Sequence, residues 1–205
     1  MSFRLLAATR NRGKLAEIAA ALADLKKLTL VRLDSFPDVA EVMEDGETFE
    51  ANALKKARQV AAATGMATLA DDSGLEVAAL GGAPGVYSAR FAGAAADDEA
   101  NNRKLLAQMA GVADGGRQAA FRCVLALCLP GGECRTCQGE LRGTIGREPR
   151  GSHGFGYDPL FVPEGQTRTI SELGVEVKAR ISHRARALAE LRRILPEFFL
   201  KAAPK

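Results

Sequence analysis

The sequence lacks any apolar run long enough to cross a membrane, and it lacks a strong net charge. Its opening apolar stretch is broken by Thr9 and Arg10 before a signal region could form. We therefore expect a cytoplasmic protein that does not associate with membranes. A formal net charge of +3 over 205 residues is also too small for a nucleic-acid-binding surface, which needs a dense stripe of Lys and Arg.

Internal repeats and long linkers are absent as well. Hydrophobic residues make up 47% of the chain and charged residues 26%, which is ordinary for a folded globular protein. A chain of this length can bury a hydrophobic core as one folding unit. We expect a single domain over residues 1–205.

Histidine is scarce, and none lies near the four cysteines Cys123, Cys128, Cys134 and Cys137. The last two have the C-x-x-C spacing found in zinc sites and redox motifs. The same segment, however, has the pattern of a hairpin with a turn at residues 130–132. We expect reduced thiols without a function, with a zinc site as the alternative.

Hydrophobic periodicity predicts alternating strands and helices, which is the order of an α/β fold. Strands are expected at residues 3–8, 28–33, 67–70, 75–80, 119–129 and 133–145. Helices are expected after residue 13, from Phe49 to Gly65, after Asp97, and at the end of the chain from Lys178 through Ile181, Ala185, Leu188, Leu191 and Leu195.

The loop between the first strand and the first helix has the residues of an anion-binding turn. It reads Thr9, Arg10, Asn11, Arg12, Gly13, Lys14. Free N–H groups at a helix start favour phosphate, Asn11 and Gly13 can adopt left-handed backbone angles, and Lys14 adds a positive charge. Such residues also occur in loops that only turn the chain, so both interpretations stay open.

Acidic side chains form a second candidate site. Glu44 and Glu47 precede the second helix, and Asp71 and Asp72 follow an apolar strand. Carboxylates on rigid elements suit Mg²⁺, which commonly bridges one or two of them to substrate phosphates. Because neighbouring strand residues face opposite sides, Asp71 and Asp72 should have different roles. The alternative is that both only terminate the strand.

A glycine-rich loop and a basic segment complete the set of candidates. In the loop 151–159, the rings of Phe155 and Tyr157 either stack on a nucleobase or close the edge of the core. In the segment 178–184, Lys178, His183 and Arg184 would lie at the start of the last helix, where the dipole disfavours positive charge. An incoming polyphosphate would relieve that repulsion, whereas a solvated basic face needs no ligand.

Taken together, these segments resemble the family of non-canonical purine nucleoside triphosphate pyrophosphatases, which includes the inosine triphosphate pyrophosphatases. The resemblance runs from end to end of the chain. It rests on T-x-N-x-x-K at residues 9–14, T-F-x-x-N-A-x-x-K at 48–56, A-D-D-S-G-L at 70–75, G-G-A-P-G-V-Y-S-A-R at 81–90, G-F-G-Y-D-P at 154–159 and I-S-H-R at 181–184.

The resemblance implies an elongated two-lobed α/β fold with a long mixed sheet, a substrate cleft between the lobes, and a homodimer. It also implies Mg²⁺ held by Glu44 and Asp72, with Asp72 as catalytic base and with Lys14 and Lys56 as catalytic residues that act on the phosphates. Residues 9–14 and Ser73 match the family's phosphate contacts. The positions that match its contacts to the base and the rest of the nucleotide are Phe155, Gly156, Tyr157, Asp158, Lys178, His183 and Arg184.

The activity implied by the family is hydrolysis of dITP, ITP and XTP to the monophosphate and pyrophosphate. Donors at His183, Arg184 or backbone N–H groups would pair with the 6-oxo group and meet a clashing donor in adenine. Two alternatives remain. One is a nucleotide-binding regulator without catalysis, and the other is an RNA-binding protein, whose affinity would fall steeply with salt.

Overall fold

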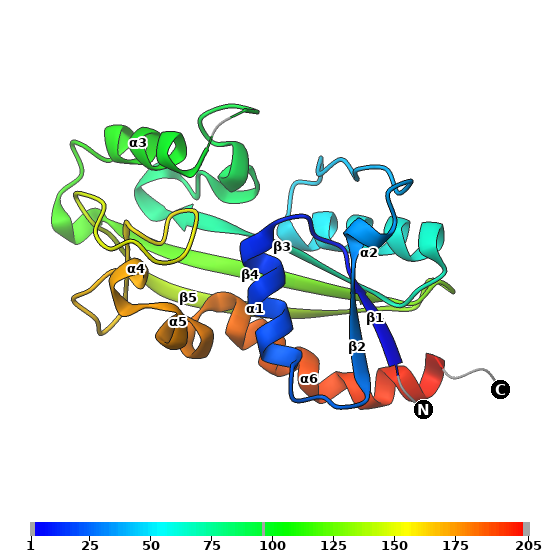
Figure 1. Cartoon of the computed structure of the whole chain (residues 1–205). Helices are drawn as coiled ribbons and strands as arrows, with labels where there is room; N and C mark the ends of the chain where they lie inside the picture. Colours follow the sequence, from blue (N-terminus) through cyan, green and yellow to red (C-terminus); the bar gives the residue numbers. More distant parts are fainter. Residues whose placement is uncertain (1–2, 96, 203–205) are drawn as a thin grey trace. The chain divides into compact units, whose positions relative to one another are not determined.

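The computed structural model describes residues 3–95 and 97–202, which form a six-stranded sheet with helices around it (Figure 1). The strand order is β2-β1-β3-β4-β5-β6. β1 pairs in parallel with β2 and β3, whereas β5 and β6 are antiparallel, so the sheet is mixed and the predicted α/β class is confirmed. The strands are β1 Phe3–Ala7, β2 Leu28–Arg32, β3 Thr68–Val77, β4 Gln118–Cys128, β5 Cys134–Ile145 and β6 Phe161–Pro163. The helices are α1 Arg12–Leu22, α2 Phe49–Thr64, α3 Asp98–Gln108, α4 Ile170–Leu173, α5 Val175–Ile181 and α6 His183–Ala202.

The chain divides into two compact units, and β3, β4 and β5 each contribute residues to both. Unit 1 contains the chain up to Asp72, the hairpin segment Cys123–Gln138, and the chain from Arg184 onward; unit 2 contains Ser73–Arg122 and Gly139–His183.

Unit 1 buries an apolar core between the strands and the helices α1 and α6. Ile18 and Leu22 of α1 and Leu191 of α6 pack on Leu5 of β1 and Leu125 of β4. On the opposite side of the sheet lies α2, which buries a face rich in alanine (Figure 1). Neighbouring residues of β3 therefore face different helices, as the pleat of a strand requires.

Unit 2 has its own core, in which aromatic rings meet. The rings of Phe121 on β4 and Phe161 on β6 lie 4.6 Å apart, and Leu105 and Met109 of α3 pack in the same cluster. Tyr157 is part of this core and is 4% exposed. The segment that carries Tyr157 is thus anchored at one residue by burial.

Local signals placed several helix ends correctly. Thr48 caps α2 by accepting a hydrogen bond from the N–H of Ala51, and Gly65 ends it with a left-handed φ of 65°. Asp97 caps α3 in the same way through the N–H of Ala100. The predicted start and end of α2 and start of α3 are confirmed.

Two predicted boundaries were wrong. Residues 67–70 and 75–80 do not form separate strands, because β3 is continuous from Thr68 to Val77. Asp71 and Asp72 therefore lie within a strand and do not terminate one. The last helix is also interrupted: Ser182 has extended angles (φ −64°, ψ 158°), so that Lys178 lies in the last turn of α5, where positive charge is favourable.

The expectation of four reduced cysteines was also wrong. Cys128 and Cys134 form a disulfide across the turn between β4 and β5, while Cys123 and Cys137 are free and buried. The C-x-x-C pair is therefore not a joint site, since one of its members is already bonded. In the part of the chain that the structure describes, no helix is both long and apolar enough to cross a membrane.

Candidate active site

The loop from Thr9 to Asn11 leads directly into α1, and its hydrogen bonds define the start of that helix. The Asn11 side chain accepts a hydrogen bond from the N–H of Lys14 at 2.9 Å, and the Thr9 hydroxyl accepts one from the N–H of Asn11 at 3.2 Å. Asn11 has φ −71° and Gly13 lies within α1, so neither has the left-handed angles that we expected. The site is a capped helix N-terminus, a geometry that favours anions.

Asp71 faces α1 and α6 and is fully buried in a network of cations. Its Oδ1 lies 2.6 Å from Nζ of Lys14, and its Oδ2 accepts a hydrogen bond from Nε of Arg184 at 2.7 Å. Arg184 also reaches Glu17, 2.5 Å away. Burial alone would raise the pKa of Asp71, but the charges of Arg184 and Lys14 outweigh it and hold that pKa well below the ordinary value. Asp71 is thus ionised and fixes both cations.

Asp72 faces the other side of the sheet, toward α2 and the segment before it. Burial, followed by the negative charge of Glu44, raises its pKa to about 6, although Lys14, Lys56 and a hydrogen bond from Asn52 act in the opposite direction. Lys56 of α2 forms an ion pair with Glu44. The structure therefore brings Asp72, Glu44, Lys56 and Lys14 into one electrostatic group, and Asp72 has the pKa of a usable base.

The segment that carries Glu44 is fastened to α2 by Asn52. The Asn52 amide accepts a hydrogen bond from the N–H of Gly46 at 2.7 Å and donates to its carbonyl at 3.4 Å. A Cβ at Gly46 would lie 2.7 Å from the Asn52 oxygen, so a larger residue here would have to displace the Asn52 amide. Asn52 was not among the predicted site residues, although it lies in the T-F-x-x-N-A-x-x-K motif.

Two carboxylates are a suitable donor set for Mg²⁺. No group of three or more His, Cys, Asp or Glu side chains that could hold a metal occurs among residues 3–95 and 97–202. Mg²⁺ does not need such a cage, because it commonly uses one or two carboxylates and completes its shell with water and phosphate oxygens. Burial is the main cause of the raised pKa of Asp72 and the charge of Glu44 adds to it, and a bound cation would favour the ionised form of both carboxylates.

In unit 2, the loop 151–159 is organised around a buried ion pair. Nζ of Lys178 lies 2.5 Å from Oδ2 of Asp158, and the same oxygen accepts a hydrogen bond from the N–H of Phe155 at 2.9 Å. Lys178 also lies 4.1 Å above the centre of the Phe155 ring. Gly154 is required because a Cβ there would lie 2.1 Å from Asp158. The structure thus brings together Phe155, Asp158 and Lys178, three of the residues that the resemblance assigned to nucleotide binding.

Other predicted residues have protein partners that change their interpretation. Tyr157 is a core residue whose hydroxyl donates to the carbonyl of Ser88 at 2.8 Å, so its ring is not a stacking surface. Arg184 is 1% exposed and donates to Asp71 and Glu17. His183 is buried with its ring stacked on Phe121, the ring centres lying 4.8 Å apart. Ser73 is a half-buried residue of β3.

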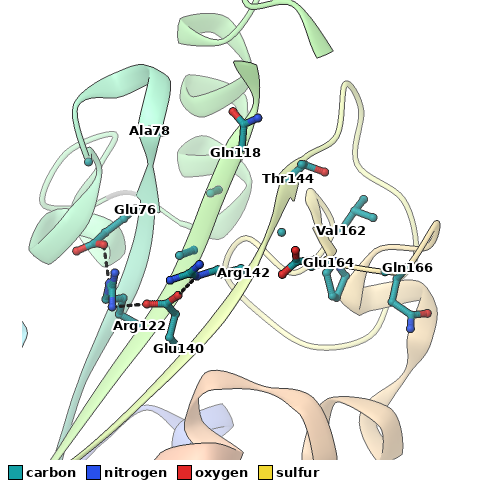
Figure 2. Close-up of a pocket in the computed structure, with 16 residues that line it drawn as sticks. Glu76, Ala78, Gln118, Arg122, Glu140, Arg142, Thr144, Val162, Glu164 and Gln166 are labelled. Atoms are coloured by element: carbon teal, nitrogen blue, oxygen red, sulfur yellow. Dashed lines mark hydrogen bonds and ion pairs between the residues drawn. The ribbon is translucent and has the colours of Figure 1, made fainter. Parts of the chain in front are cut away.

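A large cavity of about 720 Å³ lies elsewhere in unit 2, on the face of the sheet away from its core (Figure 2). An alternating network of charges crosses it, in which Arg122 contacts Glu76 at 2.7 Å and Glu140 at 2.5 Å, and Glu140 also pairs with Arg142. None of the predicted site residues is among those that line it. Its size alone does not make it the catalytic site.

The chain belongs to the Ham1 family, whose model matches residues 5–194. A protein named dITP/XTP pyrophosphatase from Geobacter sulfurreducens is 58% identical over 189 residues, which cover 92% of this chain and 94% of that protein. A protein of the same name from Streptomyces avermitilis is 52% identical over 190 residues, with the same coverage. The solved structure of a HAM1 protein from Coxiella burnetii superposes with a TM-score of 0.87 at 42% identity, covering 95% of this chain and 99% of that one. The family resemblance drawn from the motifs is confirmed.

Proposed function

We propose that this protein hydrolyses non-canonical purine nucleoside triphosphates, dITP, ITP and XTP, to the nucleoside monophosphate and pyrophosphate. The observation that carries the proposal is the group formed by Asp72, Glu44 and Lys56 together with Lys14 at the capped start of α1. It combines a base, a cation site and an anion site. The names of the relatives from Geobacter sulfurreducens and Streptomyces avermitilis support the choice of substrate.

Asp72 would act as the general base. A carboxyl with a pKa of about 6 is ionised near neutral pH and still accepts a proton from an attacking water. Glu44 and Asp72 would hold Mg²⁺, which when bound neutralises charge on the triphosphate oxygens. Lys56, paired with Glu44, would keep that carboxylate in position.

Lys14 and the N-terminus of α1 would bind the phosphates. The N–H of Lys14 is capped by Asn11, but the other N–H groups of the first turn have no partner within the helix, and the dipole adds a partial positive charge. Asp71 holds Lys14 at this end of α1 with a contact of 2.6 Å. These groups would stabilise negative charge on the departing pyrophosphate, which is the dominant contribution in phosphoryl transfer.

Base recognition would fall to unit 2. Phe155 offers a ring, and His183 and the backbone N–H groups of the loop offer hydrogen bonds to a 6-oxo group. We assign Arg184 a different role from a direct base contact, because its guanidinium donates to Asp71 and Glu17. It would act on the reaction by holding Asp71.

The remaining expectations belong to the same proposal. We propose a homodimer that acts in the cytoplasm, where nucleoside triphosphates are found. The alternative of a regulator that binds nucleotides without hydrolysing them has no support in the names of the relatives, which are those of pyrophosphatases.

The test is pyrophosphate release from dITP, XTP, GTP and ATP, each measured with Mg²⁺ and with EDTA. Rapid release from dITP and XTP that EDTA abolishes is expected. Equal release from all four would refute the purine selectivity, and binding without release would favour the regulator. Glu44→Gln should raise the Mg²⁺ concentration needed for half-maximal rate by about tenfold, because one of two proposed ligands loses its charge.

A further inference from the structure

The loop that carries Phe155 is held from a second direction by α3. Asp98 and Asn102 are four residues apart and lie on the same side of the helix. The Asp98 carboxylate accepts a hydrogen bond from the N–H of Gly156 at 2.6 Å, and the Asn102 amide donates to the carbonyl of Gly156 at 3.0 Å. One helix therefore forms hydrogen bonds with both the N–H and the carbonyl of Gly156.

Gly156 is suited to this contact by its backbone. Its φ of 63° lies in the left-handed region, which glycine adopts without cost. The N–H that Asp98 holds belongs to the peptide bond that joins Phe155 to Gly156. The position of the Phe155 ring thus depends on the Lys178 contact on one side and on α3 on the other.

The Asn102 amide makes this contact at a cost. Asn102 is 7% exposed, and its Oδ1 is buried without a hydrogen bond to any residue that the structure describes. Rotating the amide would place that oxygen against the Gly156 carbonyl, so the contact to Gly156 fixes its orientation. A buried acceptor left unsatisfied is unfavourable for stability, and such conflicts are expected where a residue serves a site.

The neighbouring Asn101 shows the contrast. It is also buried, and both ends of its amide are satisfied: it accepts from the N–H of Ala92 at 2.7 Å and donates to the carbonyl of Ala89 at 3.2 Å. Both of these hydrogen bonds go to the segment 89–92 and not to the loop. A cavity of about 380 Å³ is lined by Asp98, Asn102 and residues 151–156. It leaves room for the loop to move if the hydrogen bonds from α3 to Gly156 are lost.

We propose that Asp98 and Asn102 are positioning residues for nucleobase binding, acting through Gly156 on the Phe155 ring. The inference rests on the proposed function, since it assumes that Phe155 meets the base. The proposal gives α3 a role in substrate affinity, although this helix lies far from the loop in the sequence. The proton-accepting and phosphate-binding group of unit 1 is not involved.

The first experiment compares Asp98→Ala, Asp98→Asn and Glu99→Ala in dITP hydrolysis. Asp98 is exposed, so its variants should fold. Asp98→Ala should raise KM by about tenfold with kcat within about twofold of wild type, because one charge-assisted hydrogen bond is lost. Asp98→Asn retains an acceptor and should restore most of the affinity. Glu99→Ala is the matched control, since Glu99 lines the same cavity but pairs with Arg103, and its KM should not change.

A second readout needs no substrate. The chain has no tryptophan, so Phe155→Trp introduces a single fluorophore. Quenching of this tryptophan's fluorescence by acrylamide should increase when Asn102→Asp is added, because the hydrogen bond to the Gly156 carbonyl is lost. It should not increase with Asn101→Asp, since that amide bonds to residues 89 and 92.

Unchanged KM in Asp98→Ala together with unchanged quenching in Asn102→Asp would overturn the proposal. So would parallel losses of kcat and thermal stability that Asp98→Asn does not rescue. If the wild-type protein hydrolyses none of the triphosphates, the proposed function fails, and the quenching comparison still decides whether α3 positions the loop.

Discussion

Asp71 and Lys14 are in direct contact, with Nζ of Lys14 2.6 Å from Oδ1 of the aspartate, while Arg184 holds the other oxygen at 2.7 Å. One buried carboxylate thus fixes two cations that the motifs had assigned to the substrate. Asp71→Asn should lower the free energy of unfolding by about 3 kcal/mol, because it leaves Arg184 with reduced charge compensation in a buried position. Urea denaturation measures the loss.

The same variant should also weaken catalysis, since Lys14 loses the partner that orients it. Cys123→Ser is a suitable control, because that buried, uncharged thiol lies 3.2 Å from Oδ2 of Asp71, the oxygen that Arg184 also contacts. Stability and turnover close to wild type in Asp71→Asn would contradict the positioning role.

The pKa of Asp72 predicts opposite effects on stability and activity. Its folded pKa of about 6 lies above the ordinary value of 3.8, so the folded state binds the proton more tightly than the unfolded state. The ionised carboxylate therefore costs stability, and the cost is absent below pH 4, grows between pH 4 and 6, and reaches roughly 3 kcal/mol above that range.

Asp72→Asn should accordingly raise the melting temperature at pH 7.5 without Mg²⁺, have little effect at pH 4, and abolish turnover. Thermal unfolding of both proteins across that range measures the difference. A variant that is destabilised at pH 7.5 would show that the carboxylate is stabilised by contacts in the folded state.

Arg117 should be among the most important residues for the stability of unit 2. It is 3% exposed, and its guanidinium donates to the carbonyls of Met109, Val112, Ile145 and Gly146. Arg117→Met should cost about 3 kcal/mol, because several buried acceptors lose their donor together. The exposed Arg103→Met is the control and should change the urea midpoint very little.

The disulfide Cys128–Cys134 predicts two free thiols in the unfolded, unreduced protein and four after reduction. Closing so short a loop contributes about 2 kcal/mol, so reduction should lower stability by that amount. Thiol titration in guanidinium, before and after reduction, gives the count. Four thiols in protein prepared with rapid alkylation would show that the bond is absent in the cell, as expected of a reducing compartment.

Local chemistry predicted those parts of the fold that depend on neighbouring residues. The ends of α2 and the start of α3 follow from capping side chains, and β4 and β5 follow from long runs of strand-forming residues around a glycine turn. β3 was misjudged because Ser73 and Gly74 are typical turn residues. Pairing within the sheet overrides that preference, and no local pattern reveals it.

The sequence predicted which residues belong to the candidate site, but it did not predict which of them contact one another. The motifs brought Asp72, Glu44 and Lys56 into the set, and the structure groups them. The sequence did not predict the directions of the Arg184 and Tyr157 side chains, because segments far away in the sequence bury them. Arg117, Asp98 and Asn102 were missed altogether, since their partners are backbone groups, which carry no sequence signal.

The continuity of β3 limits which insertions and deletions this chain can accept during evolution. Asp71 and Asp72 serve opposite faces only because the strand alternates without a break. Loss or gain of one residue between Thr68 and Asp72 would exchange their surroundings, directing one carboxylate toward α2 and the other toward Lys14 and Arg184. A substitution here changes one face of the strand, whereas a change of length alters both faces together, so relatives should differ in length in their loops and keep the spacing of this strand.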